Sequence, residues 1–196
     1  MDIRFDWDEI HSLINILHQK GISYLIGNDS SLNNDDDVCV NPVHLMQRLA
    51  ACDYPLVENA SISLFILHPD LAPSVLEALQ CSERDIAENI AVVTLATLYL
   101  QQWWFFRLAF ALGHLPHFPE LPFASLWEER HLPSPLSGYG LHGLLALQEH
   151  QQQRYGVPLN FLDDWQNQIN HLLTQEEASH RELPADLREV LVQLSC

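Results

Sequence analysis

Apolar residues recur at helical spacing along most of the chain. Ile10, Leu13 and Leu17 fall on one face of a helix, and Asp6 followed by Glu9 has the spacing of a capping box. The same pattern of apolar spacing and polar caps predicts further helices at 42–50, 71–79, 82–113, 141–150, 161–173 and 184–194. Asn41-Pro42 is expected to open the first of these helices, and Ser82 and Asn160 are expected to cap two of the others.

Three short apolar runs have the length and composition of strands instead. They are Ile22–Ile26, Val38–Val40 and Ile62–Leu67, and the last is the strongest of the three. These runs predict a small N-terminal sheet, so the expected fold class is α+β, mainly α. We expect an α+β portion over residues 1–81 and a larger helical portion over residues 82–196. Because no flexible linker separates the two portions, they should share one core.

The most apolar segment of the chain is Ile90–Leu112, which has the length of a bilayer-spanning helix. Gln101, Gln102 and Arg107 interrupt the run, and the acidic residues that precede it give no positive-inside signal. A helix that is apolar on all sides is also typical of the centre of a helical protein. We therefore expect a buried central helix and no membrane partner.

The charge of the chain restricts its partners. It has 26 acidic and 9 basic residues, for a formal net charge of -17, while 47 % of its residues are hydrophobic. That much apolar surface excludes an intrinsically disordered chain. The scarcity of cations argues against binding of nucleic acid, since phosphate affinity comes mostly from Lys and Arg. A strongly acidic surface favours a protein partner that is basic.

The cysteines and the N-terminus indicate a cytoplasmic location. Cys39, Cys52, Cys81 and Cys196 form no CxxC pair, which excludes the common zinc and dithiol motifs. Four cysteines in 196 residues are too few for a disulfide scaffold, so free thiols in a reducing compartment are expected. The first residues are acidic where a signal peptide is basic. No cofactor is predicted by these features.

One local arrangement suggests a different chemistry. Gly27 is followed by a polar stretch and by an acidic apolar run, in the order helix, strand, loop, strand, helix. This arrangement resembles the start of the polymerase-β-like nucleotidyltransferase fold. The resemblance implies that Gly27 and Asn28 bind a nucleotide and that Asp35 and Asp37 hold Mg²⁺. The chain departs from the family pattern at Asn28, where Gly or Ser is usual, and at Cys39, where a second aspartate is usual. The alternative for these carboxylates is an acidic surface loop.

A second short pattern involves Arg107 and His114. Six residues separate them, which is similar to the R-x4–6-H pattern of the helical HEPN-type RNases. The residues by themselves favour a partly buried arginine that pairs with a carboxylate of a neighbouring helix.

Four consecutive aromatic side chains cover every face of the apolar helix: Trp103, Trp104, Phe105 and Phe106. At least one of them is expected to meet a second layer of helices, a partner or a ligand. Trp127 and Phe123 lie in a proline-rich stretch that is expected to cover part of this cluster. Trp103, Trp104, Arg107 and Trp127 are therefore the candidate residues for an interaction surface or pocket.

These features together predict a soluble intracellular protein that binds or regulates a protein partner through an acidic or aromatic surface, without catalysis. The alternative is a nucleotidyltransferase-like protein, degenerate and inactive in its site, with Mg²⁺ and a nucleotide as its ligands.

Overall fold

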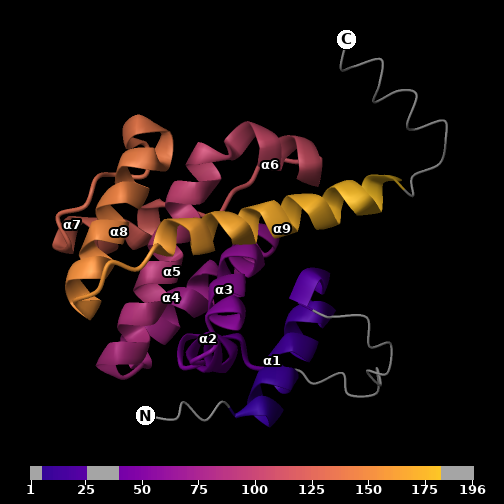
Figure 1. Ribbon diagram of the computed structural model, residues 1–196, viewed down its shortest axis with the longest axis horizontal. Helices are drawn as coiled ribbons and strands as arrows, with labels where there is room; N and C mark the ends of the chain where they lie inside the picture. The colour runs from indigo at the N-terminus through magenta and orange to yellow at the C-terminus, as the bar shows by residue number, and fades with distance from the viewer. Residues whose placement is uncertain (1–5, 26–39, 182–196) are drawn as a thin grey trace.

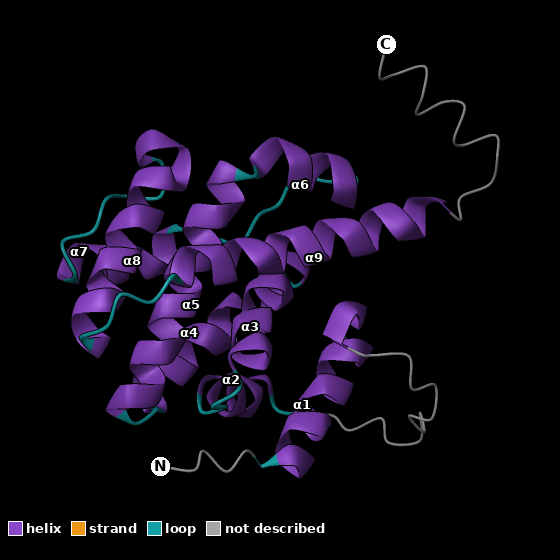
Figure 2. Ribbon diagram, viewed as in Figure 1, coloured by secondary structure: helices purple, strands orange, loops and turns teal. Residues whose placement is uncertain are grey.

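The protein is all-α over residues 6–25 and 40–181, which are the residues that the computed structural model describes. Of these residues 79 % are helical, and no strand occurs among them (Figure 2). The α-helices are α1 (Trp7–Gln19), α2 (Pro42–Ala50), α3 (Pro55–Leu67), α4 (Ala72–Cys81), α5 (Arg84–Trp103), α6 (Phe105–Leu112), α7 (Ala124–Glu129), α8 (Leu141–Tyr155) and α9 (Phe161–Arg181). Four short 3-10 helices are η1 (Ser23–Leu25), η2 (Pro69–Leu71), η3 (Leu121–Phe123) and η4 (Ser137–Gly140).

Helix α5 is the centre of the fold. Every residue from Ile90 to Gln101 is buried, and α2, α3, α4 and α8 pack around this helix (Figure 1). The prediction of a buried central helix is confirmed for this part of the run. The prediction that one helix continues to Gly113 is wrong, because α5 ends at Trp103 and a separate helix, α6, follows.

The predicted N-terminal sheet is wrong. Ile62–Leu67 lies inside α3, which begins with Pro55 at its first turn. All seven residues from Ala60 to Ile66 are buried, Ser61 and Ser63 included, so the segment has no solvent-facing side. A continuous apolar run of this length has no period that distinguishes a buried strand from a buried helix. Because Ser61 and Ser63 alternate with apolar residues, the segment also has the period-two pattern that is typical of a strand.

The other two predicted strands are also not formed in the parts that the structure describes. In the run Ile22–Ile26, residues Ser23–Leu25 form the 3-10 helix η1, and Ile26 lies outside the described residues. In the run Val38–Val40, Val40 has no regular secondary structure and the other two residues fall outside the described part of the chain.

Two of the predicted helix caps, Asp6 and Asn160, and the predicted helix start at Asn41-Pro42 are confirmed. The Asp6 carboxylate accepts a hydrogen bond from the backbone amide of Glu9 at 3.2 Å. The Asn41 side chain accepts one from the amide of Val43 at 2.9 Å, and the Asn160 Oδ1 atom accepts one from the amide three residues later at 3.4 Å. These local patterns fix where α1, α2 and α9 begin.

The predicted cap at Ser82 is wrong. The Ser82 hydroxyl donates to the Ala78 carbonyl at 2.6 Å, so it closes the C-terminal end of α4 instead of starting α5. The residue before α5 is Glu83, whose side chain makes no capping hydrogen bond.

Helices that precede residue 81 pack against helices that follow it. Helix α3 packs against α5 on one side and against α9 on another, and α9 crosses the front of the molecule in Figure 1. In the core, the rings of Phe65, Phe118 and Phe123 form a stack with centroid distances of 5.2 and 5.3 Å.

None of the described helices has, by itself, the length and hydropathy needed to cross a bilayer. Only Pro55–Leu67 taken together with Pro69–Cys81 meets that criterion, and these two segments are bent by 104° relative to each other. The first of them is α3, which is buried in the core of the fold.

Candidate interaction surface

The turn between α5 and α6 brings together three of the four candidate interaction residues. The rings of Trp103 and Trp104 meet edge to face with their centroids 5.8 Å apart, and both side chains are half-buried. The guanidinium of Arg107 lies 4.9 Å from the centroid of the Trp104 ring, a cation–π contact within one helical turn. The Trp104 Nε1 atom is buried and has no hydrogen-bond partner among the described residues.

The environment of Arg107 differs from the one that the sequence predicts. Its side chain is exposed, and the ion pairs within the described residues are Arg48–Glu9 and Arg130–Glu88. The predicted pairing of Arg107 with a carboxylate is therefore wrong for the part of the chain that can be described. The contact with Trp104 holds the cation against its own helix.

Trp127 belongs to a different environment. It lies on α7, half-buried against the core, and no ring contact joins it to Trp103 or Trp104 in the described structure. Phe123 is fully buried in the core stack with Phe118, so it is a core residue.

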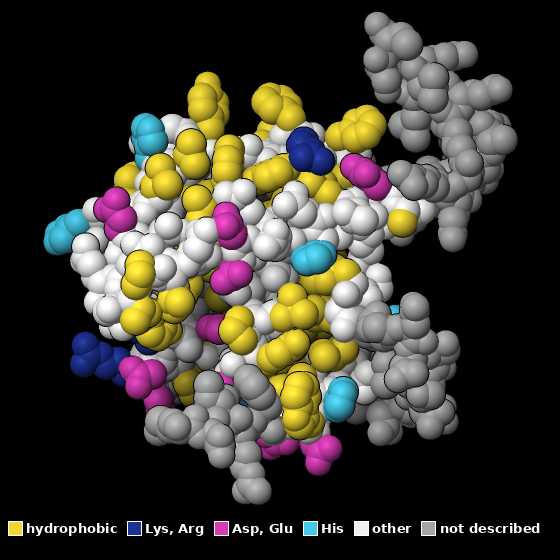
Figure 3. All heavy atoms as spheres, viewed as in Figure 1, with side chains coloured by type: hydrophobic (Ala, Val, Ile, Leu, Met, Phe, Trp, Pro, Cys, Tyr) yellow, Lys and Arg dark blue, Asp and Glu magenta, His cyan; other side chains and the backbone are white. Residues whose placement is uncertain are grey.

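The structure adds four residues that were not among the candidate interaction residues chosen from the sequence. Phe106 is 85 % exposed and Phe110, one turn later on α6, is 71 % exposed. Leu136 and Tyr139, in and beside η4, are 67 % and 81 % exposed. Figure 3 shows hydrophobic side chains standing out along the upper edge of the molecule, above α6. We call Phe106, Phe110, Leu136 and Tyr139 the apolar edge.

Two glycines position η4 against the central helix. A Cβ atom on Gly140 would overlap the Tyr99 backbone carbonyl, and one on Gly143 would overlap the Tyr99 ring. Only glycine therefore permits this close approach of η4 and α8 to α5. Tyr99 lies about one turn before the end of α5 at Trp103, so η4 packs near the end of α5 that leads to α6.

The backbone at Tyr139 is unusual. Its φ angle is +54°, in the left-handed region that residues other than glycine rarely adopt. Such a conformation costs on the order of 1–3 kcal/mol. The fold thus holds an exposed aromatic side chain in a strained conformation.

The apolar edge also differs from the rest of the chain in charge. No acidic residue occurs between Glu88 and Glu120, the interval that contains α6, or between Glu129 and Glu149, the interval that contains η4. In a chain of 196 residues with 26 acids, both segments of the edge are free of carboxylates.

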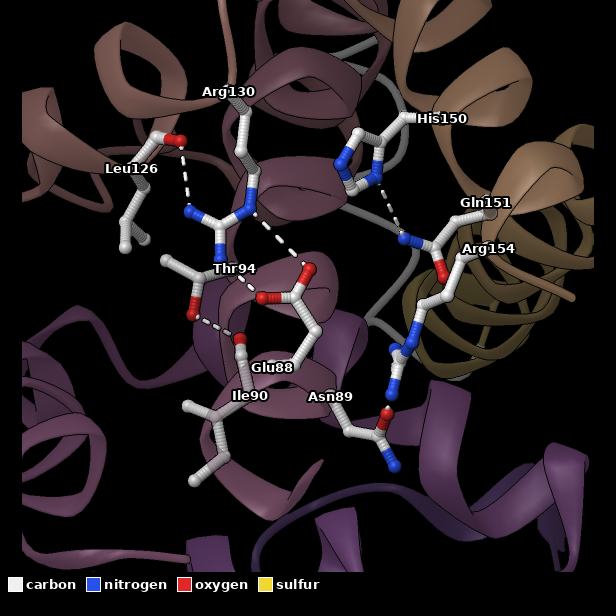
Figure 4. Close-up of polar contacts among 9 residues, drawn as sticks. All are labelled: Glu88, Asn89, Ile90, Thr94, Leu126, Arg130, His150, Gln151 and Arg154. Atoms are coloured by element: carbon white, nitrogen blue, oxygen red, sulfur yellow. Dashed lines mark hydrogen bonds and ion pairs between the residues drawn. The ribbon is translucent and has the colours of Figure 1, made fainter. Parts of the chain in front are cut away.

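A polar cluster joins the base of α5 to α7 and α8 (Figure 4). The carboxylate of Glu88 forms an ion pair with Arg130, whose Nη1 atom also donates to the Leu126 carbonyl at 3.0 Å. Asn89, the next residue of α5, accepts a hydrogen bond from Arg154 at 3.1 Å. Each polar group here has a structural partner, so this cluster ties helices together.

Glu58 on α3 is a carboxylic acid in a partly buried environment. Burial raises the pKa of its carboxyl to about 7; the nearby Arg154 lowers it and Asp53 raises it further. Burial, and the negative charges of Glu58 and Asp53, also raise the pKa of the Cys52 thiol. A thiol held in its neutral form is a poor nucleophile.

The residues implied by the nucleotidyltransferase resemblance cannot be placed. Gly27, Asn28, Asp35 and Asp37 all lie outside the described residues. The strand expected just before Gly27 is not formed in its first part, since residues 23–25 are a 3-10 helix. Within the described ranges, no group of three or more His, Cys, Asp or Glu side chains is placed to hold a metal ion.

The chain matches no protein-family model, and neither curated proteins nor solved structures show significant similarity to it.

One signal for the apolar edge was present in the sequence. Phe106 and Phe110 are four residues apart within an interval that has no acidic residue. On an otherwise acidic chain, that combination indicates a face that is not selected for solvation alone.

Proposed function

We propose that this chain is a non-catalytic binding module that docks a protein partner through the apolar edge. The observation that carries the proposal is the exposure of Phe106 and Phe110 on one face of α6, in a segment without carboxylates.

Three properties of the edge support a docking role. Aromatic side chains are enriched at the centres of protein interfaces, and charged side chains are depleted there. Phe106 and Phe110 have the i, i+4 spacing with which a helix inserts anchors into an apolar groove. Tyr139 adds a third exposed ring, and its backbone conformation is strained. Strained backbone conformations are common at functional sites.

The experiment compares two double variants as bait. In F106D/F110D, two acidic side chains replace the exposed rings of the edge. In the matched control V157D/L159D, the same charges are added at two other exposed apolar positions, which are 42 % and 49 % exposed in the linker between α8 and α9. Proteins cross-linked to the wild-type chain in a lysate of its native host are identified by mass spectrometry.

The proposal expects cross-linked proteins that disappear with F106D/F110D and persist with V157D/L159D. If every cross-linked protein is retained by F106D/F110D, the edge is not a docking surface. A basic partner bound through the acidic surface stays a separate prediction. Its binding would weaken as salt is added and would be insensitive to both double variants.

A further inference from the structure

We infer that the partner of the apolar edge is a second copy of this chain, so that the protein is a homodimer formed through α6 and η4. This inference rests on the proposed docking role of the edge and names its occupant.

The charge of the chain leads to this occupant. Two molecules that each carry a formal charge of -17 repel one another strongly. They can approach most closely through surface segments that lack carboxylates, and the two segments of the apolar edge are of that kind. A basic partner would gain nothing from the absence of acids at its docking site. A second acidic copy is repelled less strongly because of that absence.

The exposed area is sufficient for a large part of a dimer interface. A buried aromatic side chain removes about 150–250 Å² from water, so Phe106, Phe110 and Tyr139 at their observed exposures supply roughly 350–600 Å². A standard interface buries about 800 Å² on each partner. Leu136, which is 67 % exposed, adds to this area.

The geometry of α6 suits a two-fold axis. Phe106 and Phe110 are separated by about 6 Å along the helix, so two antiparallel α6 helices place each Phe106 beside the partner copy's Phe110. Closed two-fold dimers of this isologous kind are the commonest oligomers. The one permanent cation on α6 is Arg107, and its contact with Trp104 turns it toward its own helix.

Sedimentation equilibrium of the full chain tests the inference. The wild-type protein should be a dimer whose dissociation constant falls as ionic strength rises from about 0.03 M to about 0.3 M, because salt screens the repulsion between the two acidic bodies. F106D/F110D should raise the dissociation constant by at least about tenfold, while V157D/L159D should leave it nearly unchanged.

A second variant distinguishes the loss of the interface from a folding defect. Tyr139→Asn removes a ring of the edge, and asparagine tolerates the left-handed backbone at this position. It should also weaken the dimer, and circular dichroism should show unchanged helix content in all three variants.

Three results would overturn the inference. One is a monomer at every concentration and salt; another is a dimer that F106D/F110D does not weaken. The third is a monomer that sediments with phosphatidylcholine–phosphatidylglycerol vesicles and loses this with F106D/F110D, which would assign the edge to lipid. If the chain is monomeric but other proteins still cross-link in an edge-dependent way, the proposed function stands and only the choice of partner fails.

Discussion

The hydroxyl of Tyr24 lies 2.8 Å from the side-chain oxygen of Gln168, which joins the first part of the chain to α9. The same hydroxyl is 2.9 Å from the Ser63 hydroxyl of α3, and Ser63 in turn is 3.3 Å from the Gln168 backbone carbonyl. Burial raises the pKa of Tyr24 well above its usual range, and the hydrogen bond with Ser63 opposes this shift. A three-residue polar link therefore holds η1, α3 and α9 in one arrangement.

Removing the hydroxyl tests the strength of this link. Tyr24→Phe leaves the buried Gln168 oxygen without its hydroxyl partner, so the free energy of unfolding should fall by about 1–3 kcal/mol. Urea denaturation of the two proteins measures the difference. Tyr155→Phe is the control, because Tyr155 is 49 % exposed and the change should have little effect. Equal stability of Tyr24→Phe and wild type would contradict the assigned role.

Glu58 should make stability depend on pH. Its carboxyl has a pKa of about 7 in the folded protein, above the value near 4.3 of an unfolded chain. The folded state therefore holds a proton between these two pH values that the unfolded state has lost. The contribution of Glu58 to stability falls as pH rises through this window.

Glu58→Gln removes that dependence, since glutamine stays neutral. At pH 8 the variant should be more stable than the wild type by about 3–4 kcal/mol, and the difference should vanish near pH 4. Denaturation curves at several pH values give the comparison. Glu177→Gln, at an exposed position of α9, is the matched control. A stability difference for Glu58→Gln that does not vary with pH would show that the carboxyl titrates alike in both states.

The close approach of α8 to α5 predicts that Gly143 does not accept even a methyl group. A Cβ atom at Gly143 would overlap the ring of Tyr99, so Gly143→Ala should destabilise by about 1–3 kcal/mol. In an ordinary helix interior the same change stabilises by about 1 kcal/mol. The sign of the effect, measured by thermal unfolding, therefore decides between these two environments.

A double-mutant cycle tests whether Tyr99 is the cause. Tyr99→Leu removes the ring that the methyl group of Gly143→Ala would meet, so the two changes together should cost less than the sum of their separate costs. Strict additivity would place the strain elsewhere.

The ion pair between Glu88 and Arg130 should contribute more than the one between Glu9 and Arg48. The side chains of the first pair are 24 % and 15 % exposed, and those of the second are 41 % and 21 % exposed. Glu88→Gln leaves a half-buried guanidinium without its counter-ion and should cost about 1–3 kcal/mol. Glu9→Gln should cost less than about 1 kcal/mol. The two variants are compared in urea, and a reversed order would refute the ranking.

The local features of the fold could be predicted from the sequence, and the non-local ones could not. The Asp6 and Asn41 caps depend on residues two or three positions away, so their identity was sufficient to locate them. The burial of α3 on all sides depends on α5 and α9, which are distant in the chain. Its sequence showed only that Ile62–Leu67 is apolar, and a buried strand has the same pattern.

The same difference between local and non-local features applies to the residues of the candidate interaction surface. Trp103, Trp104 and Arg107 could be grouped because they are neighbours within the chain. The exposure of Phe106 could not be predicted, because it depends on the end of α5 at Trp103 and on which helices cover α6. Trp127 was grouped with them by its position in the proline-rich stretch, and the structure places it on α7 against the core.

The position of α9 across α3 has a consequence during synthesis on the ribosome. Helix α3 leaves the ribosome about 100 residues before α9 does, and until then its α9-facing side has no cover. Long-range contacts of this kind form late and expose apolar surface in the meantime. A nascent chain stalled before Phe161 should therefore be a better chaperone client than the finished protein, and ribosome profiling of stalled chains with bound chaperone would detect it.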